Sequence, residues 1–362
     1  MIRRYTEIFV CWATSLLSQL KSSRSGVLVY LCVITLSGCV DELQLPIRQV
    51  EPRLVVEGLI TTDPPPYSIK LTFSGRYNSA YELPEGLLVN GAVVTINDDQ
   101  GHSVRLRQDP LAPAYYFVRD TTFRGKAGRR YTLHIRLDDG RQYVSSPELL
   151  TDVPPIEQLT AEYQSGASGL PQPSIYRVLL DTRDPITPGN YYRWSALAYS
   201  PIWQNGVPKV FESVTVNACL TTTYGPLTDV LSDALINGNR ISRRPVLDAP
   251  IYGTGRHYVE VQQYSLTRAA YQYWTRFEEQ RTRTGSLFDA QPASIEGNVH
   301  QQTDTTIVAL GYFGASTISR KRLVIPGDTI NYGRFIVRYG GLFKGNCSVV
   351  PSDAELENWT TN

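Results

Sequence analysis

Short runs of alternating apolar and polar residues dominate the chain from residue 53 to residue 150. This period of two places successive side chains on opposite faces of a strand and predicts antiparallel β-structure. We expect strands over residues 54–60, 68–74, 92–97, 115–118, 131–137 and 142–145. Turn residues at 97–101 and 139–140 separate some of them, because Gly, Asn and Asp tolerate the positive φ of tight turns. The pattern predicts an immunoglobulin-like β-sandwich over residues 53–150.

Two consecutive prolines, Pro154 and Pro155, break this pattern and mark a predicted domain boundary, because proline donates no ladder hydrogen bond. Strand patterns resume over residues 158–163, 176–181, 191–199, 210–218, 258–264, 306–312, 322–325 and 335–339. Residues 266–283 instead have a helical period, with Ser265 as the expected N-cap and Gly285 as the stop. The fold class is therefore mainly β. We expect a larger β-rich domain over 156–350 with one packed α-helix, and a C-terminal tail over 351–362.

The N-terminal region carries an apolar run of ten residues, 27–36, which follows a basic segment and ends at Leu36-Ser37-Gly38-Cys39. This is the organisation of a secretory signal with a processing site, and we expect residues 1–38 to be a signal peptide. A permanent span is less favoured because it needs about 20 apolar residues. The four-residue ending resembles a bacterial lipobox, which implies that Cys39 carries the lipid, and a plain signal peptide cut near Gly38 is the alternative. Residues 39–52 have the composition of a tether.

The charge and cysteine content agree with export. Removing residues 1–38 takes four of the 35 basic side chains and one of the 34 acidic ones, which leaves a net charge of −2. We therefore expect no binding to nucleic acid, and attachment to the membrane through the lipid. Beyond Cys39 the chain keeps only Cys219 and Cys347, which form a candidate disulfide in an oxidising compartment. Two unpaired, buried thiols are the alternative.

No catalytic or cofactor motif is visible in the sequence. The Gly-x-Ser-x-Gly elbow, a Cys and His cluster and a glycine-rich phosphate loop do not occur, so we expect no catalytic residue, no metal and no cofactor. Tyrosine is abundant, with 23 residues against 10 Phe. Because tyrosine and tryptophan combine an apolar body with a polar tip, we name Tyr192, Trp194, Tyr199 and Trp203 as a candidate surface for a partner or a ligand. Ordinary sheet packing is the alternative, and Trp203 has the most loop-like surroundings.

Several short segments occur in an order that resembles a known family. They are residues 52–58 (PRLVVEG), Tyr271-Gln272-Tyr273-Trp274, residues 285–289 (GSLFD), Gln291-Pro292, Gly297-Asn298 and residues 310–315 (LGYFGA). The family is that of the Bacteroidetes outer-membrane lipoproteins termed domain of unknown function four-two-four-nine. The resemblance implies an outer-membrane lipoprotein, often encoded beside a TonB-dependent transporter, and it supplies no catalytic residues. Residues 40–42 (VDE) also resemble an acidic surface-export signal.

These observations favour a non-enzymatic accessory or binding partner of a TonB-dependent transporter or envelope complex. The alternatives are a cell-envelope hydrolase that acts on glycans and a structural or adhesion lipoprotein. A cleft with two convergent carboxylates or three polar ligands would favour the hydrolase, whereas a broad exposed patch of Tyr and Trp would favour the partner role.

Overall fold

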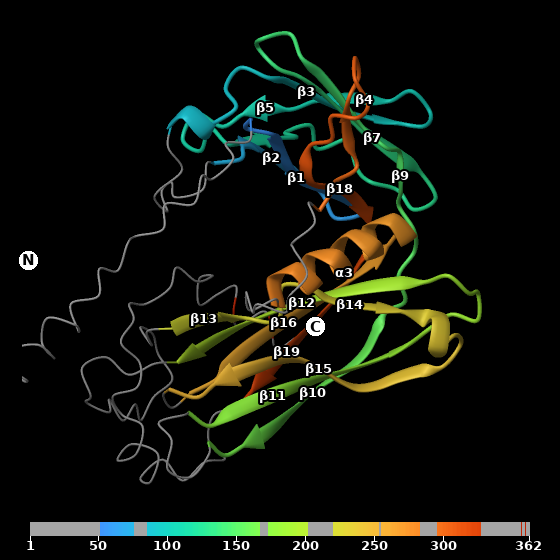
Figure 1. Cartoon of the computed structure of the whole chain (residues 1–362). Helices are drawn as coiled ribbons and strands as arrows, with labels where there is room; N and C mark the ends of the chain where they lie inside the picture. The colour runs from blue at the N-terminus through green and yellow to red at the C-terminus, as the bar shows by residue number, and fades with distance from the viewer. Residues whose placement is uncertain are drawn as a thin grey trace, which may run out of the picture. The chain divides into compact units, whose positions relative to one another are not determined.

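The computed structural model describes residues 51–75, 85–166, 173–201, 220–252, 255–282 and 295–326, together with Leu356 and Trp359. These residues belong to one compact unit, 51–362. They form two β-sandwiches and one α-helix (Figure 1), so the predicted mainly-β fold class is confirmed. No helix of the described part of the chain is long and apolar enough to cross a membrane.

The first sandwich contains two sheets that share one apolar core. The first sheet has the order β18-β1-β2-β6-β5: Leu310–Ser316, Leu54–Thr61, Ser68–Phe73, Tyr115–Phe117 and Arg107–Gln108. The second has the order β17-β8-β7-β3-β4, with β9 paired to β7: Val299–Gln301, Gln142–Ser145, Arg130–Arg136, Val93–Asp98, Ser103–Arg105 and Glu148–Leu149. A short 3-10 helix, η1, spans Glu85–Leu87. Alternate residues of both sheets, such as Ile60 and Ile96, are buried in this shared core, as period-two alternation predicts.

Strands from the far end of the chain complete this first sandwich. β18 pairs in parallel with β1, from Val55 with Leu310 to Thr61 with Ser316, and β17 pairs with β8. The range predicted for the second domain, 156–350, contains both of these strands. Their place beside β1 and β8 was not visible in the sequence, because a parallel neighbour can come from any distance along the chain and leaves no local pattern.

The second sandwich also contains two sheets that share one apolar core. One sheet has the order β10-β11-β15: Ile156–Gln164, Ile175–Arg183 and Arg240–Pro250. The other has the order β13-β12-β16-β19, with β14 also paired to β12: Leu220–Tyr224, Tyr191–Pro201, His257–Leu266, Ile318–Ile325 and Asp229–Ser232. A 3-10 helix, η2, spans Asp233–Leu235. The predicted strands at 210–218 and 335–339 lie outside the described residues.

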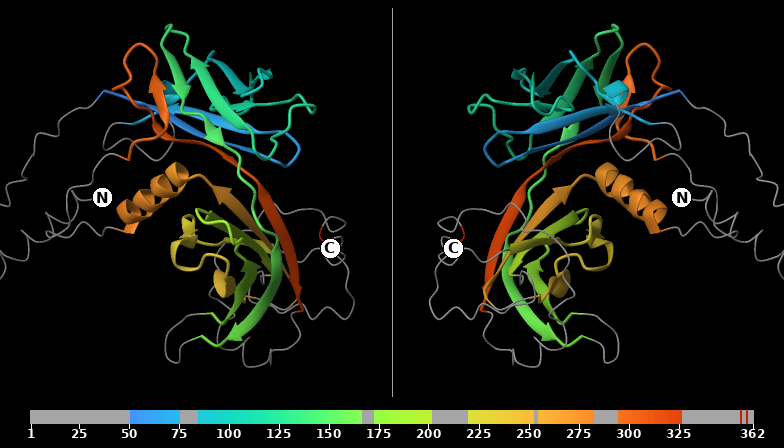
Figure 2. Two further views of the ribbon diagram at one scale, coloured as in Figure 1. Left: turned by 90° about the vertical axis from the view of Figure 1, so that its right-hand side faces the viewer. Right: turned by 90° about the vertical axis from the view of Figure 1, so that its left-hand side faces the viewer.

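Helix α3, Arg268–Thr282, contacts both sandwiches (Figures 1 and 2). Its N-cap is Thr267, whose hydroxyl accepts a hydrogen bond from the Ala270 amide at 3.2 Å, rather than the predicted Ser265. Tyr271 packs on Tyr191 of β12, with ring centroids 5.0 Å apart. Tyr273 packs on Tyr312 of β18, with centroids 4.9 Å apart. The helix therefore closes one side of the space where the second sandwich meets β1 and β18.

Candidate binding pocket and apolar tip

A small pocket lies where β1, β18, β12, β16 and α3 meet, with an enclosed volume of about 50 Å³ and an open mouth. Its larger lining side chains are Leu59, Arg193, Tyr264, Leu266, Trp274 and Tyr312. Its small residues are Gly58, Ala270, Gly314, Ala315 and Ser316. The pocket is thus apolar and aromatic, and it contains one charged side chain.

Arg193 is that charge, and strand alternation aims it into the pocket. Its neighbours Tyr192 and Trp194 point into the core of the second sandwich, so Arg193 points to the opposite face of β12. The Cζ atom of Arg193 lies 4.3 Å from the ring centroid of Trp274 and 5.2 Å from that of Tyr264. These cation–π contacts place aromatic rings against the guanidinium.

The guanidinium of Arg193 has no acidic partner among the described residues. Its Nε atom is buried and donates no hydrogen bond to a described oxygen. No ion pair joins Arg193 to a described carboxylate. Burial lowers the pKa of the Arg193 guanidinium, which nevertheless stays protonated because the ordinary pKa of arginine is so high. The pocket therefore holds an uncompensated positive charge.

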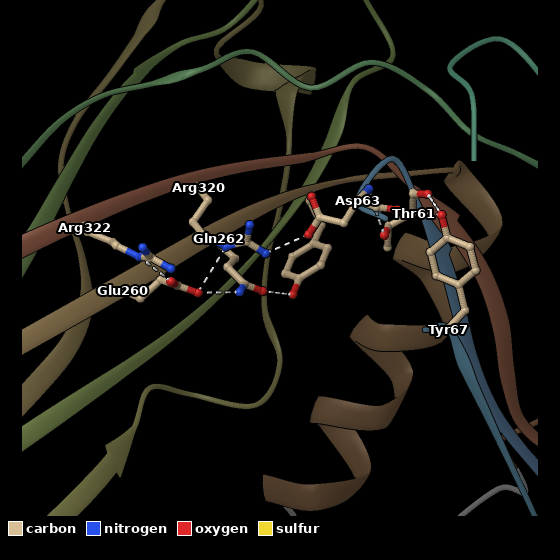
Figure 3. A network of polar contacts seen from close by, with 8 residues as sticks. Thr61, Asp63, Tyr67, Glu260, Gln262, Arg320 and Arg322 are labelled. Carbon is tan, nitrogen blue, oxygen red and sulfur yellow. Dashed lines mark hydrogen bonds and ion pairs between the residues drawn. The ribbon is translucent and has the colours of Figure 1, made fainter. Parts of the chain in front are cut away.

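The neighbouring arginines of the same sheet are paired. On β19, Arg320 and Arg322 each donate from Nε to the buried carboxylate of Glu260, at 3.1 and 2.7 Å (Figure 3). Arg320 also donates to Asp63, which follows β1, at 2.7 Å. Gln262 donates to Glu260 at 2.7 Å. This network joins the second sandwich to the first and leaves Glu260 compensated.

A second buried carboxylate, Glu148, positions the opposite wall. It accepts hydrogen bonds from the Tyr312 hydroxyl at 2.6 Å, from the Thr267 hydroxyl at 2.8 Å and from Asn298 Nδ2 at 3.2 Å. One carboxylate therefore joins β18, which contributes Tyr312 to the pocket, to the N-terminus of α3 and to the segment before β17. Burial raises the pKa of Glu148, and these hydrogen bonds oppose that rise.

At one end of the second sandwich two neighbouring loops expose large aliphatic side chains. Ile186 is 85% exposed and Leu235 is 96% exposed, and we call these two residues the apolar tip. Asn237 Nδ2 donates to the Ile186 carbonyl at 2.9 Å, which brings the two loops together.

Buried carboxylates hold both loops of the apolar tip. Asp184 accepts hydrogen bonds from the Gly238 amide at 2.9 Å and from the Tyr192 hydroxyl. Asp233 accepts from the amides of Gly189 and Asn190, both at 2.8 Å. The exposed side chains therefore stand on loops whose backbone is fixed from inside.

The structure changes the interpretation of the predicted aromatic surface. Tyr192 and Trp194 are each 1% exposed and belong to the core of the second sandwich, so the prediction that they form a surface is wrong. The physical reason is that helix and sheet cover both faces of β12, and the face with the larger rings is the inner one. Tyr199 is partly buried against Trp359, with ring centroids 5.8 Å apart. Trp203, Cys39, Cys219 and Cys347 lie outside the described residues.

Sequence reasoning missed the residues that build the pocket. Arg193 follows two tyrosines and precedes a tryptophan in a predicted strand. A charged residue at such a position is the one local signal that the face opposite the core carries a polar group. The contribution of Tyr312 has no such signal, because it depends on β18 pairing with β1. Within the described ranges, no group of three or more His, Cys, Asp or Glu side chains has the arrangement of a metal site.

Comparisons with known proteins identify the family. The sequence model described as "Domain of unknown function (DUF4249)" matches residues 40–322. The chain belongs to this family. The match covers the pocket and the apolar tip of this DUF4249 protein. A search of curated proteins found no match.

Among solved structures, the DUF4249 chain is similar to the chicken interferon gamma receptor alpha chain, with 9% identity, a TM-score of 0.18, and coverage of 59% of this chain and 90% of the other. It is also similar to a tetra-tandem repeat in the extending region of a large adhesion protein, with 10% identity, a TM-score of 0.15, and coverage of 59% and 46%.

Proposed function

We propose that this protein is a non-enzymatic lipoprotein of the outer membrane that is anchored through Cys39 and acts as an accessory partner of a TonB-dependent transporter. The observation that carries the proposal is the apolar tip. Side chains as exposed as Ile186 and Leu235 contribute little to the stability of the fold. When a partner covers them, their apolar surface is removed from water, and this burial favours binding.

The construction of the tip supports recognition of a protein. The carboxylates of Asp184 and Asp233 are 2% and 3% exposed and accept backbone amides, so the two loops are ordered before any partner arrives. Preorganised loops lose less conformational entropy on binding. A stable interface buries about 1,200–2,000 Å² in total, so the tip would supply central anchors within a wider contact surface.

The anchor is tested by metabolic labelling. The Cys39→Ala variant should incorporate no labelled palmitate and should leave the membrane fraction, because it removes the acylated thiol. A Cys219→Ala variant is the matched control and should retain its lipid. Labelled palmitate in the Cys39→Ala protein would contradict the lipoprotein proposal.

The partner is tested by affinity purification of the full-length lipoprotein from native outer membranes in mild detergent. We expect a TonB-dependent transporter to be recovered with the wild-type protein. The Ile186→Ser/Leu235→Ser double variant should recover markedly less of it. Leu111→Ser is the matched control, because Leu111 is 94% exposed but lies on the first sandwich. Trp203→Ala tests the remaining residue of the predicted aromatic surface and should weaken the association without unfolding the chain.

Recovery of the lipoprotein alone from wild-type membranes would contradict the transporter role. Equal recovery with the tip variant and with Leu111→Ser would contradict the role of the apolar tip while leaving the partner in place.

A further inference from the structure

We propose that the pocket around Arg193 binds the carboxylate of a small organic anion with an apolar or aromatic body. This inference concerns a face of the molecule other than the apolar tip and does not depend on a transporter partner. It rests on the one unpaired guanidinium of the described pocket, on the rings that flank it and on the apolar walls around it.

An unpaired guanidinium in such surroundings costs free energy, because burial removes water from a charge that nothing compensates. The same sheet shows how the chain normally avoids this cost: Arg320 and Arg322 share Glu260. No described acidic residue does the same for Arg193. An anion from outside would supply the missing charge.

The aromatic contacts define which donors remain for a ligand. Trp274 and Tyr264 lie within 4.3 and 5.2 Å of the Arg193 Cζ atom, a range in which ring faces attract a guanidinium. The ring faces do not accept hydrogen bonds in the plane of the guanidinium, and no described oxygen accepts from its two terminal nitrogens, whereas its Nε atom is buried. The planar fork of the guanidinium matches the two oxygens of a carboxylate, which it binds with two parallel hydrogen bonds.

The remaining walls select a single negative charge on an apolar body. Arg193 is the one ionisable lining residue apart from the tyrosines, and the other large lining groups are Leu59, Leu266, Trp274 and Tyr312. The Ser316 hydroxyl already donates to the Ser265 carbonyl at 2.5 Å. One cation balances a carboxylate, whereas a phosphate dianion would retain an uncompensated charge against apolar walls.

The body of the ligand would lie at the open mouth of the pocket. Gly314 and Ala270 present no side chain beyond a methyl group there, whereas Gly58 and Ala315 face the core of the first sandwich. The carboxylate could belong to a free small molecule or to the C-terminus of a peptide, and the test separates these two sources.

The test is isothermal titration of the full-length, detergent-solubilised protein with benzoate, benzamide, phenyl phosphate and the tripeptide Ala-Ala-Phe. We expect saturable binding of a carboxylate at one site per chain. Benzamide, which has the same shape without the charge, should bind at least about tenfold more weakly, because a charge-assisted hydrogen bond contributes that much or more. Stronger binding of benzoate than of the tripeptide assigns a free small molecule, and the reverse order assigns a peptide terminus.

Variants separate a binding role of Arg193 from a structural one. Arg193→Met should reduce carboxylate affinity at least about tenfold, and Arg193→Lys should give an intermediate affinity because it keeps the charge but loses the planar fork. Arg177→Met is the matched control, since Arg177 lies on β11 of the other sheet and pairs with Asp248. It should bind as the wild type does. Thermal unfolding of each variant verifies folding, and Arg193→Lys retains the test if Arg193→Met does not fold.

Three results would overturn the proposal. The first is the absence of saturable binding of both benzoate and Ala-Ala-Phe to the wild-type protein. The second is unchanged carboxylate affinity in the folded Arg193 variants. The third is stronger binding of phenyl phosphate than of either carboxylate, which would assign the pocket to a different anion.

Discussion

Replacement of Glu148 by alanine should destabilise the protein strongly, because this carboxylate fixes the pocket wall from inside. Glu148 is 3% exposed and accepts hydrogen bonds from Tyr312, Thr267 and Asn298. In the Glu148→Ala variant Asn298 Nδ2 keeps its bond to the Phe313 carbonyl at 2.8 Å, and the Thr267 hydroxyl keeps the Ala270 amide. The Tyr312 hydroxyl loses its carboxylate acceptor and is left beside the Thr267 hydroxyl.

The magnitude follows from these contacts. A hydrogen bond to a charged group contributes about 1.5–3 kcal/mol, but losses within one network do not add fully, and removing a buried charge recovers part of its desolvation cost. We therefore expect a loss of about 3 kcal/mol in the free energy of unfolding. For a unit of this size that corresponds to a fall of about 6 °C in Tm.

The assay is denaturant unfolding of Glu148→Ala and of Glu148→Gln, which keeps the shape and one acceptor oxygen. Burial raises the folded-state pKa of Glu148, so its stabilising contribution is complete below the ordinary pKa and is lost as pH rises through the raised value. Glu148→Gln should therefore gain stability relative to the wild type as pH rises above the ordinary carboxyl pKa of about 4.3. An unchanged midpoint for Glu148→Ala would refute the reasoning.

Three further predictions concern other buried groups. Burial lowers the pKa of His257 to about 4, so His257 of the unfolded chain is protonated first as pH falls below 6.5. The free energy of unfolding of the wild type should therefore fall by about 3 kcal/mol relative to that of His257→Gln between pH 6.5 and pH 4. Denaturant unfolding of both proteins at the two pH values measures this difference. Gly311 has φ +83°, and a Cβ there would lie 2.1 Å from the Val56 carbonyl oxygen. Gly311→Ala should therefore separate β18 from β1 and lower the free energy of unfolding by more than about 3 kcal/mol, with fast exchange of the β1 amide hydrogens. Wild-type protection of these amides against exchange would contradict this prediction. Glu260→Ala should lower the free energy of unfolding by about 3 kcal/mol, because it leaves two arginines without their buried carboxylate. Asp63→Ala removes a half-exposed ion pair and should lower it by less than about 1 kcal/mol. Equal melting temperatures of the two variants would contradict this prediction.

Local periodicity predicted much of the individual structure. The strand predicted at 191–199 is observed over Tyr191–Pro201, and the helix predicted at 266–283 is observed over Arg268–Thr282. The N-cap differs because Ser265 still belongs to β16, where its hydroxyl donates to the Thr151 carbonyl at 2.6 Å. The chain therefore leaves the strand one residue before the capping Thr267.

Two features were not predictable from local pattern. β15, Arg240–Pro250, carries Pro245 and several arginines, which normally argue against a strand, but it lies at the edge of its sheet, where a missing amide is tolerated. The pocket depends on pairing between β1 and β18, which are far apart in the sequence. The alternation of the strand showed that Tyr192 and Trp194 share a face. It could not show that this face is the buried one, because burial depends on the sheet that packs against it.

The proposed partner role is tested most directly by site-specific photo-crosslinking in living cells. A photoreactive residue at position 235 of the otherwise wild-type lipoprotein should form an adduct with a TonB-dependent transporter, because Leu235 is 96% exposed on a preordered loop. The same residue at position 111 should form no such adduct. Absence of a transporter adduct at position 235, or equal adducts at both positions, would contradict the account.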